Sequence, residues 1–401
     1  MNVSTAPAGS IRKREFHMLL LVGLVAINLR SVIAAPAPFL TQIRGDLGLS
    51  EAAMGALVSL PVLCFALAAP LAGVLVRFVG PRRALLAGLI LVVAATAGRP
   101  MGSVVLFMVG TLLVGVGVTV GNVVMPALIK RDLPHRAAAG TSVFTAGMCV
   151  GAAAAAGLTP MLAQATGWRV ALASWALPAA LAAAASMLVL RSAAGAEPPV
   201  SVPPPAPHRR LATHPLAWAV AIFLGAQSWS YFSVTTWLPT YLTQQAGTSV
   251  TTSGLALSVY QVLGIAGSFA VAPLVRRWSS QIPLTVGVSL CWAATTLGLA
   301  AAPAMWPLWT LLGGVTHGAG ITVAMILVVL RAESSRSVES LSSMAQLIGY
   351  GIGAVGPFAV GAVLGITGSW TWSLSLVIAA AVVMLLAGLV AGRAVTVEGA
   401  R

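Results

Sequence analysis

The chain has 401 residues, of which 58% are hydrophobic and only 7% are charged, and its mean hydropathy is +0.96. These values exclude a soluble globular domain and predict a polytopic membrane protein. A net charge of +14 would suggest a nucleic-acid partner for a soluble protein, but the positions of the basic residues explain it without one.

Twelve apolar runs are candidates for membrane-spanning helices. The third run is the shortest, so its ends are the least well defined. The runs cover residues 18–40, 52–76, 84–98, 102–129, 138–163, 170–190, 215–241, 251–275, 283–301, 305–330, 339–364 and 370–392. They predict an all-α integral membrane protein with twelve transmembrane helices.

The first run, residues 18–40, contains Arg30 and no acidic residue. At 1.5 Å per residue this run is about 34 Å long, which spans a hydrocarbon core of ~30 Å and puts Arg30 near its middle. A guanidinium costs about 2.5–3.5 kcal/mol at that depth on insertion scales. Arg30 is therefore either bonded to backbone carbonyls of a neighbouring helix or exposed in a cavity, where it binds an anionic or electron-rich solute. We favour the second interpretation.

Asn28 lies two residues before Arg30, about 200° around the same helix, so both cannot face one cavity unless the helix is distorted. We expect Arg30 to point inward and Asn28 to bond to a neighbouring helix. Pro36 and Pro38 are expected to bend the outer end of this span.

The basic residues lie mainly on one side of the predicted membrane. With the N-terminus inside, the inner loops and tails hold 18 of the 22 Lys and Arg residues, and the outer loops hold Arg44, Arg99 and Arg169. This bias predicts cytoplasmic termini and a multi-pass protein of the plasma membrane, which is the inner membrane in a bacterium. It also explains the pI of 11.4.

A Pro-rich stretch interrupts the hydrophobic pattern after the sixth run and is typical of a water-exposed linker. The predicted organisation is a cytoplasmic tail (1–17), a six-helix bundle (18–192), the cytoplasmic linker (193–214), a second six-helix bundle (215–392) and a cytoplasmic tail (393–401).

The two halves resemble each other at an offset of about 200 residues. Leu40-Thr41-Gln42 recurs as Leu242-Thr243-Gln244, and Leu75-Val76-Arg77 recurs as Leu274-Val275-Arg276. Because each half has six spans, both halves have the same orientation and form a parallel repeat. In membrane proteins that are built from such a repeat and carry a solute, the binding site is expected between the halves near the middle of the membrane.

Acidic and metal-binding side chains are scarce in the spans. The three cysteines lie far apart in apolar runs, which indicates neither a disulfide framework nor a metal site, and we expect no cofactor. A cation would meet Arg30 without a carboxylate to screen it, which argues against cationic substrates. All eight acidic residues fall in predicted tails, loops or span ends: Glu15, Asp46, Glu51, Asp132, Glu197, Glu333, Glu339 and Glu398.

Four polar residues in the second half are candidates for lining a cavity. Gln227 and Tyr231 are four residues apart and so share one face of the seventh span, and Gln261 lies in the eighth. His317 is the only histidine deep in a span; it could bind a proton together with the anion or donate a hydrogen bond while neutral. Each of these side chains could instead join neighbouring helices. Glycines repeated at a spacing of four, such as Gly314 and Gly318, indicate close helix packing.

The loop after the second span resembles the signature of the major facilitator superfamily. It runs from Gly73 through Arg77 and Gly80 to Arg82 and Arg83, similar to the pattern Gly-x-x-x-Asp-Arg-x-Gly-Arg-Arg. The usual acidic position is Arg77 here, so a cytoplasmic gate must use other carboxylates, and Asp132, Glu333 and Glu339 in other inside loops are available. The candidate gating residues are Arg77, Arg82, Arg83, Arg131, Asp132, Arg331 and Glu333.

Within this superfamily the chain resembles permeases of the cyanate and 2-nitroimidazole transporter type. Asn28-Leu29-Arg30, Gln227-Ser228 and Trp237-Leu238-Pro239 carry the resemblance. It implies a carrier for small anions or small polar compounds. It also implies that spans one, four, seven and ten surround the cavity, which adds Asn122 to the candidate substrate-binding residues Arg30, Gln227, Tyr231, Gln261 and His317.

The sequence thus predicts a secondary active or facilitative transporter, not an enzyme, that works by rocker-switch alternating access. The expected partners are a small-molecule substrate, membrane lipid and a coupled proton or counter-anion, with no nucleic acid, and the protein is expected to be a monomer. An efflux pump for neutral or weakly acidic drugs is the alternative. Substrate identity, transport direction and coupling ion stay open at this point.

Overall fold

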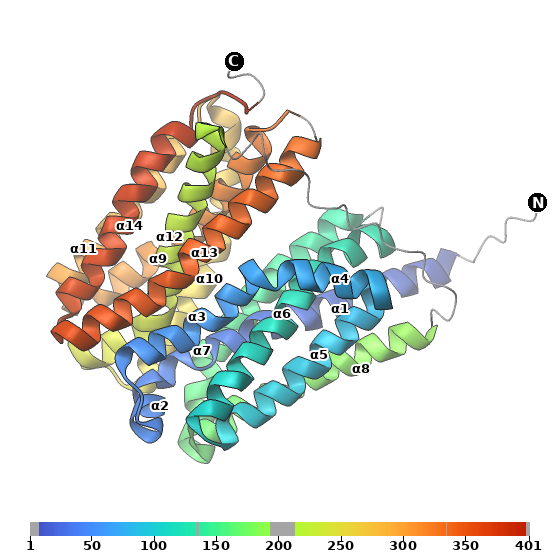
Figure 1. The fold of residues 1–401 in the computed structure, drawn as a ribbon, viewed down its shortest axis with the longest axis horizontal. Helices are drawn as coiled ribbons and strands as arrows, with labels where there is room; N and C mark the ends of the chain where they lie inside the picture. Colours follow the sequence, from blue (N-terminus) through green and yellow to red (C-terminus); the bar gives the residue numbers. More distant parts are fainter. Residues whose placement is uncertain (1–7, 134–135, 193–212, 334, 398–401) are drawn as a thin grey trace, which may run out of the picture.

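The computed structural model describes residues 8–133, 136–192, 213–333 and 335–397, and helices are the only regular secondary structure in these ranges (Figure 1). The N-terminal half contains α1 (Ala8–Ala34), η1 (Ala37–Phe39), α2 (Leu40–Leu47), α3 (Glu51–Leu67), α4 (Ala69–Val79), α5 (Pro81–Gly98), η2 (Arg99–Met101), α6 (Val104–Asp132), α7 (Ala137–Ala173) and α8 (Ala176–Ser192). The C-terminal half contains α9 (Pro215–Gln245), α10 (Val250–Arg277), α11 (Ile282–Ala301), η5 (Pro303–Met305), α12 (Trp306–Leu330), α13 (Ser335–Thr367) and α14 (Trp370–Ala391).

These helices confirm the twelve expected membrane passes. Nine helices in the described ranges are long and apolar enough to cross a membrane. The other three passes are α3 continued by α4, the shorter apolar helix α8, and α9, which is 31 residues long and carries several polar side chains. The predicted linker lies outside the described residues except for Thr213 and His214.

Helix ends differ from the predicted runs where glycine or proline breaks the backbone. α1 ends at Ala34 and not at residue 40, because Pro36 and Pro38 cannot donate backbone hydrogen bonds. The chain continues through η1 into α2, which confirms the expected bend. α7 runs past the predicted end of the fifth span to Gly167, whose positive φ of 76° turns the chain into the sixth pass.

The internal repeat is visible in the turns of the structure. Gly48 and Gly247 both have positive φ, at 64° and 62°, and follow α2 and α9, which end the first pass of each half. Two residues later, Ser50 and Ser249 each cap the next helix, with the hydroxyl oxygen 3.1 Å from a backbone nitrogen. These matched positions support the parallel repeat expected from the sequence.

The two halves meet along a limited set of elements. The main pairs are α3 with α13, α7 with α10, and η1 with α9 and α10. In Figure 1 the blue-to-green half and the yellow-to-red half converge near the start of α3 and spread apart toward the end where α1 begins. With the orientation predicted by the charge bias, the outer side is closed and the halves diverge toward the cytoplasm.

Glycines allow the closest approach between the halves. A Cβ on Gly55 of α3 would lie 2.3 Å from the carbonyl oxygen of Pro357 on α13, and one on Gly254 of α10 would lie 2.5 Å from that of Ala156 on α7. Gln164 also donates to Thr251 across this contact, at 2.6 Å. Backbones this close leave no room for a side chain at either glycine.

Candidate solute-binding site

A small cavity lies between the two halves, where α1 ends at Ala34. Its lining comes from α1 and η1, from α3 and α7, and from α9 and α10. Its volume is about 20 Å³, which is room for about one water molecule. The residues around it are Arg30, Ile33, Ala34, Ala37, Val58, Ala152, Tyr231, Phe232, Thr235, Thr236 and Gln261.

Arg30 is the only charged side chain among the residues that line this cavity. It is half-buried, and its guanidinium carbon lies 5.9 Å from the centroid of the Tyr231 ring. Within the described part of the chain, no residue accepts a hydrogen bond from this guanidinium. A cation–π contact of about 0.5–2 kcal/mol does not offset an insertion cost of about 2.5–3.5 kcal/mol. The geometry leaves the donors of Arg30 available to a bound solute.

Tyr231 connects Arg30 to a stack of rings in the C-terminal half. Its ring lies 5.0 Å from that of His317, which in turn stacks on Tyr260 at 4.7 Å with an interplanar angle of 17°. The Tyr231 hydroxyl lies 3.3 Å from the amide nitrogen of Gln261, another cavity residue. These contacts fix the Tyr231 ring beneath Arg30.

His317 lies behind Tyr231 and does not line the cavity itself. It is 7% exposed, and its Nε2 has no hydrogen-bond partner. A Cβ on Gly264 would lie 2.3 Å from that nitrogen, so the glycine makes the space that the imidazole occupies. In this conformation His317 supports Tyr231, and direct contact with solute stays a prediction.

Gln227 is also set back from the cavity. Its amide oxygen accepts from the indole nitrogen of Trp292 at 2.7 Å, and its amide nitrogen donates to the His317 carbonyl at 3.1 Å. It is 1% exposed, so both ends of the amide serve packing within the C-terminal half. Asn122, on α6, is half-buried and does not line the cavity. A binding role for these two residues stays a prediction.

The expectation for Asn28 is wrong. Its amide nitrogen donates to Leu24 of its own helix at 2.9 Å, and its buried amide oxygen has no partner. The Asn28 amide reaches the carbonyl one turn earlier in its own helix more easily than it reaches an acceptor on a neighbouring helix. Arg30 does turn toward the space between the halves, as expected.

Arg99 lies in the predicted outer connection between α5 and α6, but its side chain is buried. The side chain is 1% exposed, and its guanidinium donates to the Val32 carbonyl on α1 at 2.7 Å. The connection between α5 and α6 is only the short helix η2 and two further residues, so it folds against α1 instead of extending into water. The sequence did carry a signal for this burial, namely an arginine in a very short connection between two apolar runs.

The predicted gating residues form contacts within each half in this conformation. Asp132 at the end of α6 pairs with Arg82 of α5 at 2.9 Å and with Arg131 at 2.8 Å. Arg77, in the last turn of α4, and Arg83, in the first turn of α5, are exposed. Asp132 therefore joins the inner ends of α5 and α6 within the N-terminal half.

The corresponding inner end of the C-terminal half is held by backbone contacts. Arg331 is 3% exposed and donates to the carbonyls of Ala391 and Gly392 at the end of α14. Burial lowers the pKa of its guanidinium from the ordinary value. Glu333 accepts from Thr396 at 2.6 Å. The side chain of Glu339 lies outside the described part. Gating by these residues stays a prediction.

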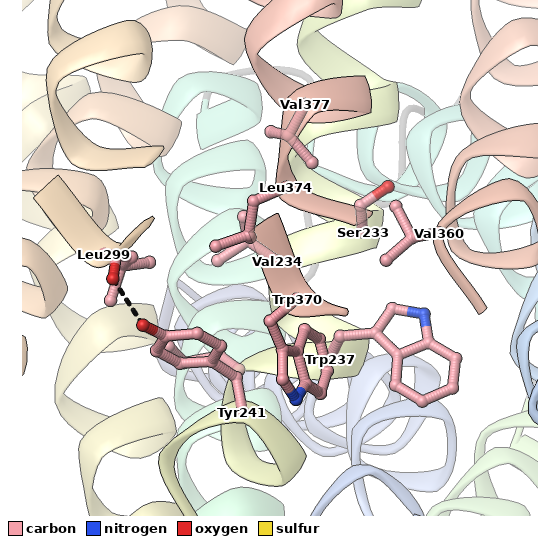
Figure 2. A pocket seen from close by; sticks show the side chains of 10 residues that line it. Ser233, Val234, Trp237, Tyr241, Leu299, Val360, Trp370, Leu374 and Val377 are labelled. Carbon is pink, nitrogen blue, oxygen red and sulfur yellow. Dashed lines mark hydrogen bonds between the residues drawn. The ribbon is translucent and has the colours of Figure 1, made fainter. Parts of the chain in front are cut away.

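A second small cavity lies within the outer part of the C-terminal half (Figure 2). Figure 2 shows Trp237, Trp370 and Tyr241 around it, with the Tyr241 hydroxyl donating to the Leu299 carbonyl. The indole nitrogen of Trp237 donates to the Pro357 carbonyl at 2.9 Å. The motif that begins at Trp237 thus packs helices together and does not face the central cavity.

Comparisons with known proteins agree with this architecture. The sequence profile of the Major Facilitator Superfamily matches residues 19–357. The chain is 34% identical to the 2-nitroimidazole transporter of Escherichia coli (strain K12) over 98% of this chain and 99% of that protein. It is 27% identical to the cyanate transport protein CynX of the same organism over 88% of this chain and 91% of that protein.

The fold is also similar to that of solved transporters. The crystal structure of a D-xylose-proton symporter aligns with a TM-score of 0.76 over 96% of this chain and 99% of that chain, at 15% sequence identity. At this level of identity the similarity concerns the fold alone.

Proposed function

The chain belongs to the major facilitator superfamily and is a multi-pass membrane transporter, and we propose that it moves a small anionic or electron-rich polar solute by alternating access. The two halves would rock about the contacts of α3 with α13 and α7 with α10. We infer further that both termini face the cytoplasm, because the inner loops carry most of the basic residues.

Arg30 is the observation that carries the proposed substrate class. Its unbonded guanidinium lies at a cavity between the halves, against the ring of Tyr231, with Gln261 opposite on α10. Hydrogen bonds from a charged donor contribute about 1.5–3 kcal/mol, which is roughly a 10- to 150-fold gain in affinity. A carboxylate, a cyanate-like ion or the oxygens of a nitro group could accept them.

The relatives support this class of solute. One is named for 2-nitroimidazole and another for cyanate, and both align along most of this chain. Both named compounds are small and present electron-rich atoms. None of the carboxylates in the described ranges lines the cavity, which argues against a cationic substrate.

Transport by purified protein in liposomes tests the proposal. We would measure initial rates for 2-nitroimidazole and cyanate with wild-type protein, Arg30→Gln and Arg30→Lys. Arg136→Gln serves as control, because this arginine is half-exposed and pairs with Glu15 away from the cavity. Arg30→Gln should raise KM by about 10- to 150-fold, Arg30→Lys should be intermediate, and the control should match wild type. Wild-type KM in Arg30→Gln would refute the role of Arg30.

The drug sensitivity of whole cells separates uptake from efflux of neutral or weakly acidic drugs. Cells that overproduce an efflux pump should become less sensitive to 2-nitroimidazole, whereas an importer should leave them equally or more sensitive. Arg30→Gln should abolish either phenotype, because both directions use the same cavity.

A further inference from the structure

Arg99 is buried without a carboxylate partner in the described part of the chain. Its side chain is 1% exposed, its Nη2 donates to the Val32 carbonyl at 2.7 Å, and its Nε has no partner. Burial of a charge with so few partners is costly. A structural reason must therefore offset the cost of burying Arg99. Its one described hydrogen bond, to the Val32 carbonyl, indicates that reason.

The Val32 carbonyl is left without its helical partner by Pro36. In an α-helix the carbonyl of residue 32 accepts from the N–H of residue 36, and proline has none. The helical hydrogen-bond pattern continues to Ala35, whose N–H donates to the Ser31 carbonyl at 2.9 Å, so an N–H at position 36 would be the next donor in the series and would face Val32. The Arg99 guanidinium supplies the missing donor.

This bond holds the part of α1 that forms the cavity. Val32 lies two residues after Arg30, and its neighbours Ile33 and Ala34 line the cavity beside it. Arg99 is itself held against α6, where a Cβ on Gly110 would lie only 2.5 Å from the Arg99 Cβ. The Arg99 side chain thus joins the end of α1 to the junction of α5 and α6.

We propose that Arg99 is a positioning residue for the solute site. By replacing the donor that Pro36 lacks, it fixes the outer end of α1 and hence the direction in which Arg30 enters the cavity. This inference rests on the proposed function, in which Arg30 holds the solute.

The test combines three variants at these two positions, with 2-nitroimidazole as the probe. Arg99→Gln should raise KM about 5- to 50-fold with a smaller change in kcat, because a misplaced Arg30 loses part of the roughly 10- to 150-fold affinity that its hydrogen bonds contribute. Arg99→Lys keeps one donor and should recover part of the loss. Arg99→Gln combined with Pro36→Ala should recover most of it, because the new N–H at position 36 bonds to Val32.

Arg169→Gln is the matched control, since Arg169 lies at the same predicted outer side but is 42% exposed and paired with Asp46. It should keep the wild-type KM. If Arg99→Gln fails to fold, Gly110→Ala provides a second test. It displaces Arg99 without removing its charge and should also raise KM.

Labelling of α1 separates this inference from the proposed function. In protein whose three native cysteines are replaced, Ile33→Cys should react with a thiol reagent at a different rate when Arg99→Gln is added, and Pro36→Ala should restore the rate. A wild-type KM in Arg99→Gln, or no recovery with Pro36→Ala, would overturn the inference. If instead Arg30→Gln binds normally while the labelling rates change as expected, the proposed function fails and the role of Arg99 in holding α1 stands.

Discussion

Gly55 provides a direct way to perturb the closed outer contact between the halves. Gly55→Ala places a methyl group 2.3 Å from the Pro357 carbonyl oxygen and 2.8 Å from the Phe358 Cα. Ordinary contacts between such atoms are about 3.5–4 Å, so α3 and α13 must separate by about 1 Å. Over-packing of this kind costs about 1–3 kcal/mol.

The expected effect is a change in the populations of the two conformations. If the contact between Gly55 and Pro357 exists only while the outer side is closed, the whole cost shifts the equilibrium toward the outward-open state. A change of about 1–3 kcal/mol corresponds to roughly a 5- to 150-fold shift. Transport should slow, because the closed outer state is needed in each cycle.

Site-specific labelling from outside measures this shift. In protein without native cysteines, Thr235→Cys lies at the central cavity and reports access to it. A membrane-impermeant maleimide added to right-side-out vesicles should label this site slowly, and Gly55→Ala should raise the rate by the factor given above. Gly351→Ala on α13 is the control, because a Cβ there meets no atom within 4 Å. Equal labelling rates in both variants of folded protein would refute the reasoning.

Three other substitutions test individual contacts. Gln227→Leu should lower stability by about 1–3 kcal/mol for each of the two groups it leaves unpaired, measured by chemical unfolding, while the Kd for 2-nitroimidazole stays within about twofold of wild type; a normal stability with lost binding would make Gln227 a ligand. Asp132→Asn should lower the melting temperature, because Arg82 and Arg131 lose their shared carboxylate; an unchanged melting temperature would show that this ion pair contributes nothing. His317→Ala removes the ring that supports Tyr231 and should raise the KM for 2-nitroimidazole about 2- to 12-fold, and a change in the pH dependence alone would favour a proton site.

The fold was predictable because membrane helices depend mainly on local composition. Long apolar runs identified every pass, and the charge bias predicts their orientation. Boundaries were less accurate at Pro36 and Gly167, where one residue interrupts a helix without changing the average hydropathy. The repeat was recognisable from short matching segments, although the paired turns at Gly48 and Gly247 are clear only in the backbone angles.

The candidate site was predictable in part. Arg30 was recognisable because a charged residue inside an apolar run is rare. Tyr231 and Gln261 were identified because few polar residues lie in these spans. Gln227 and Arg99 could not be assigned in this way, because their partners Trp292 and Val32 are 65 and 67 residues distant in sequence. Periodicity reports which face of a helix is polar, but not which neighbour that face meets.

The affinity of purified protein for 2-nitroimidazole in detergent tests the central claim most directly, because it reads the solute site without the transport cycle. Wild-type protein should bind, and Arg30→Gln should bind at least about tenfold more weakly while keeping the wild-type melting temperature. Equal dissociation constants for the two proteins would contradict the assignment of Arg30 as the group that holds the solute.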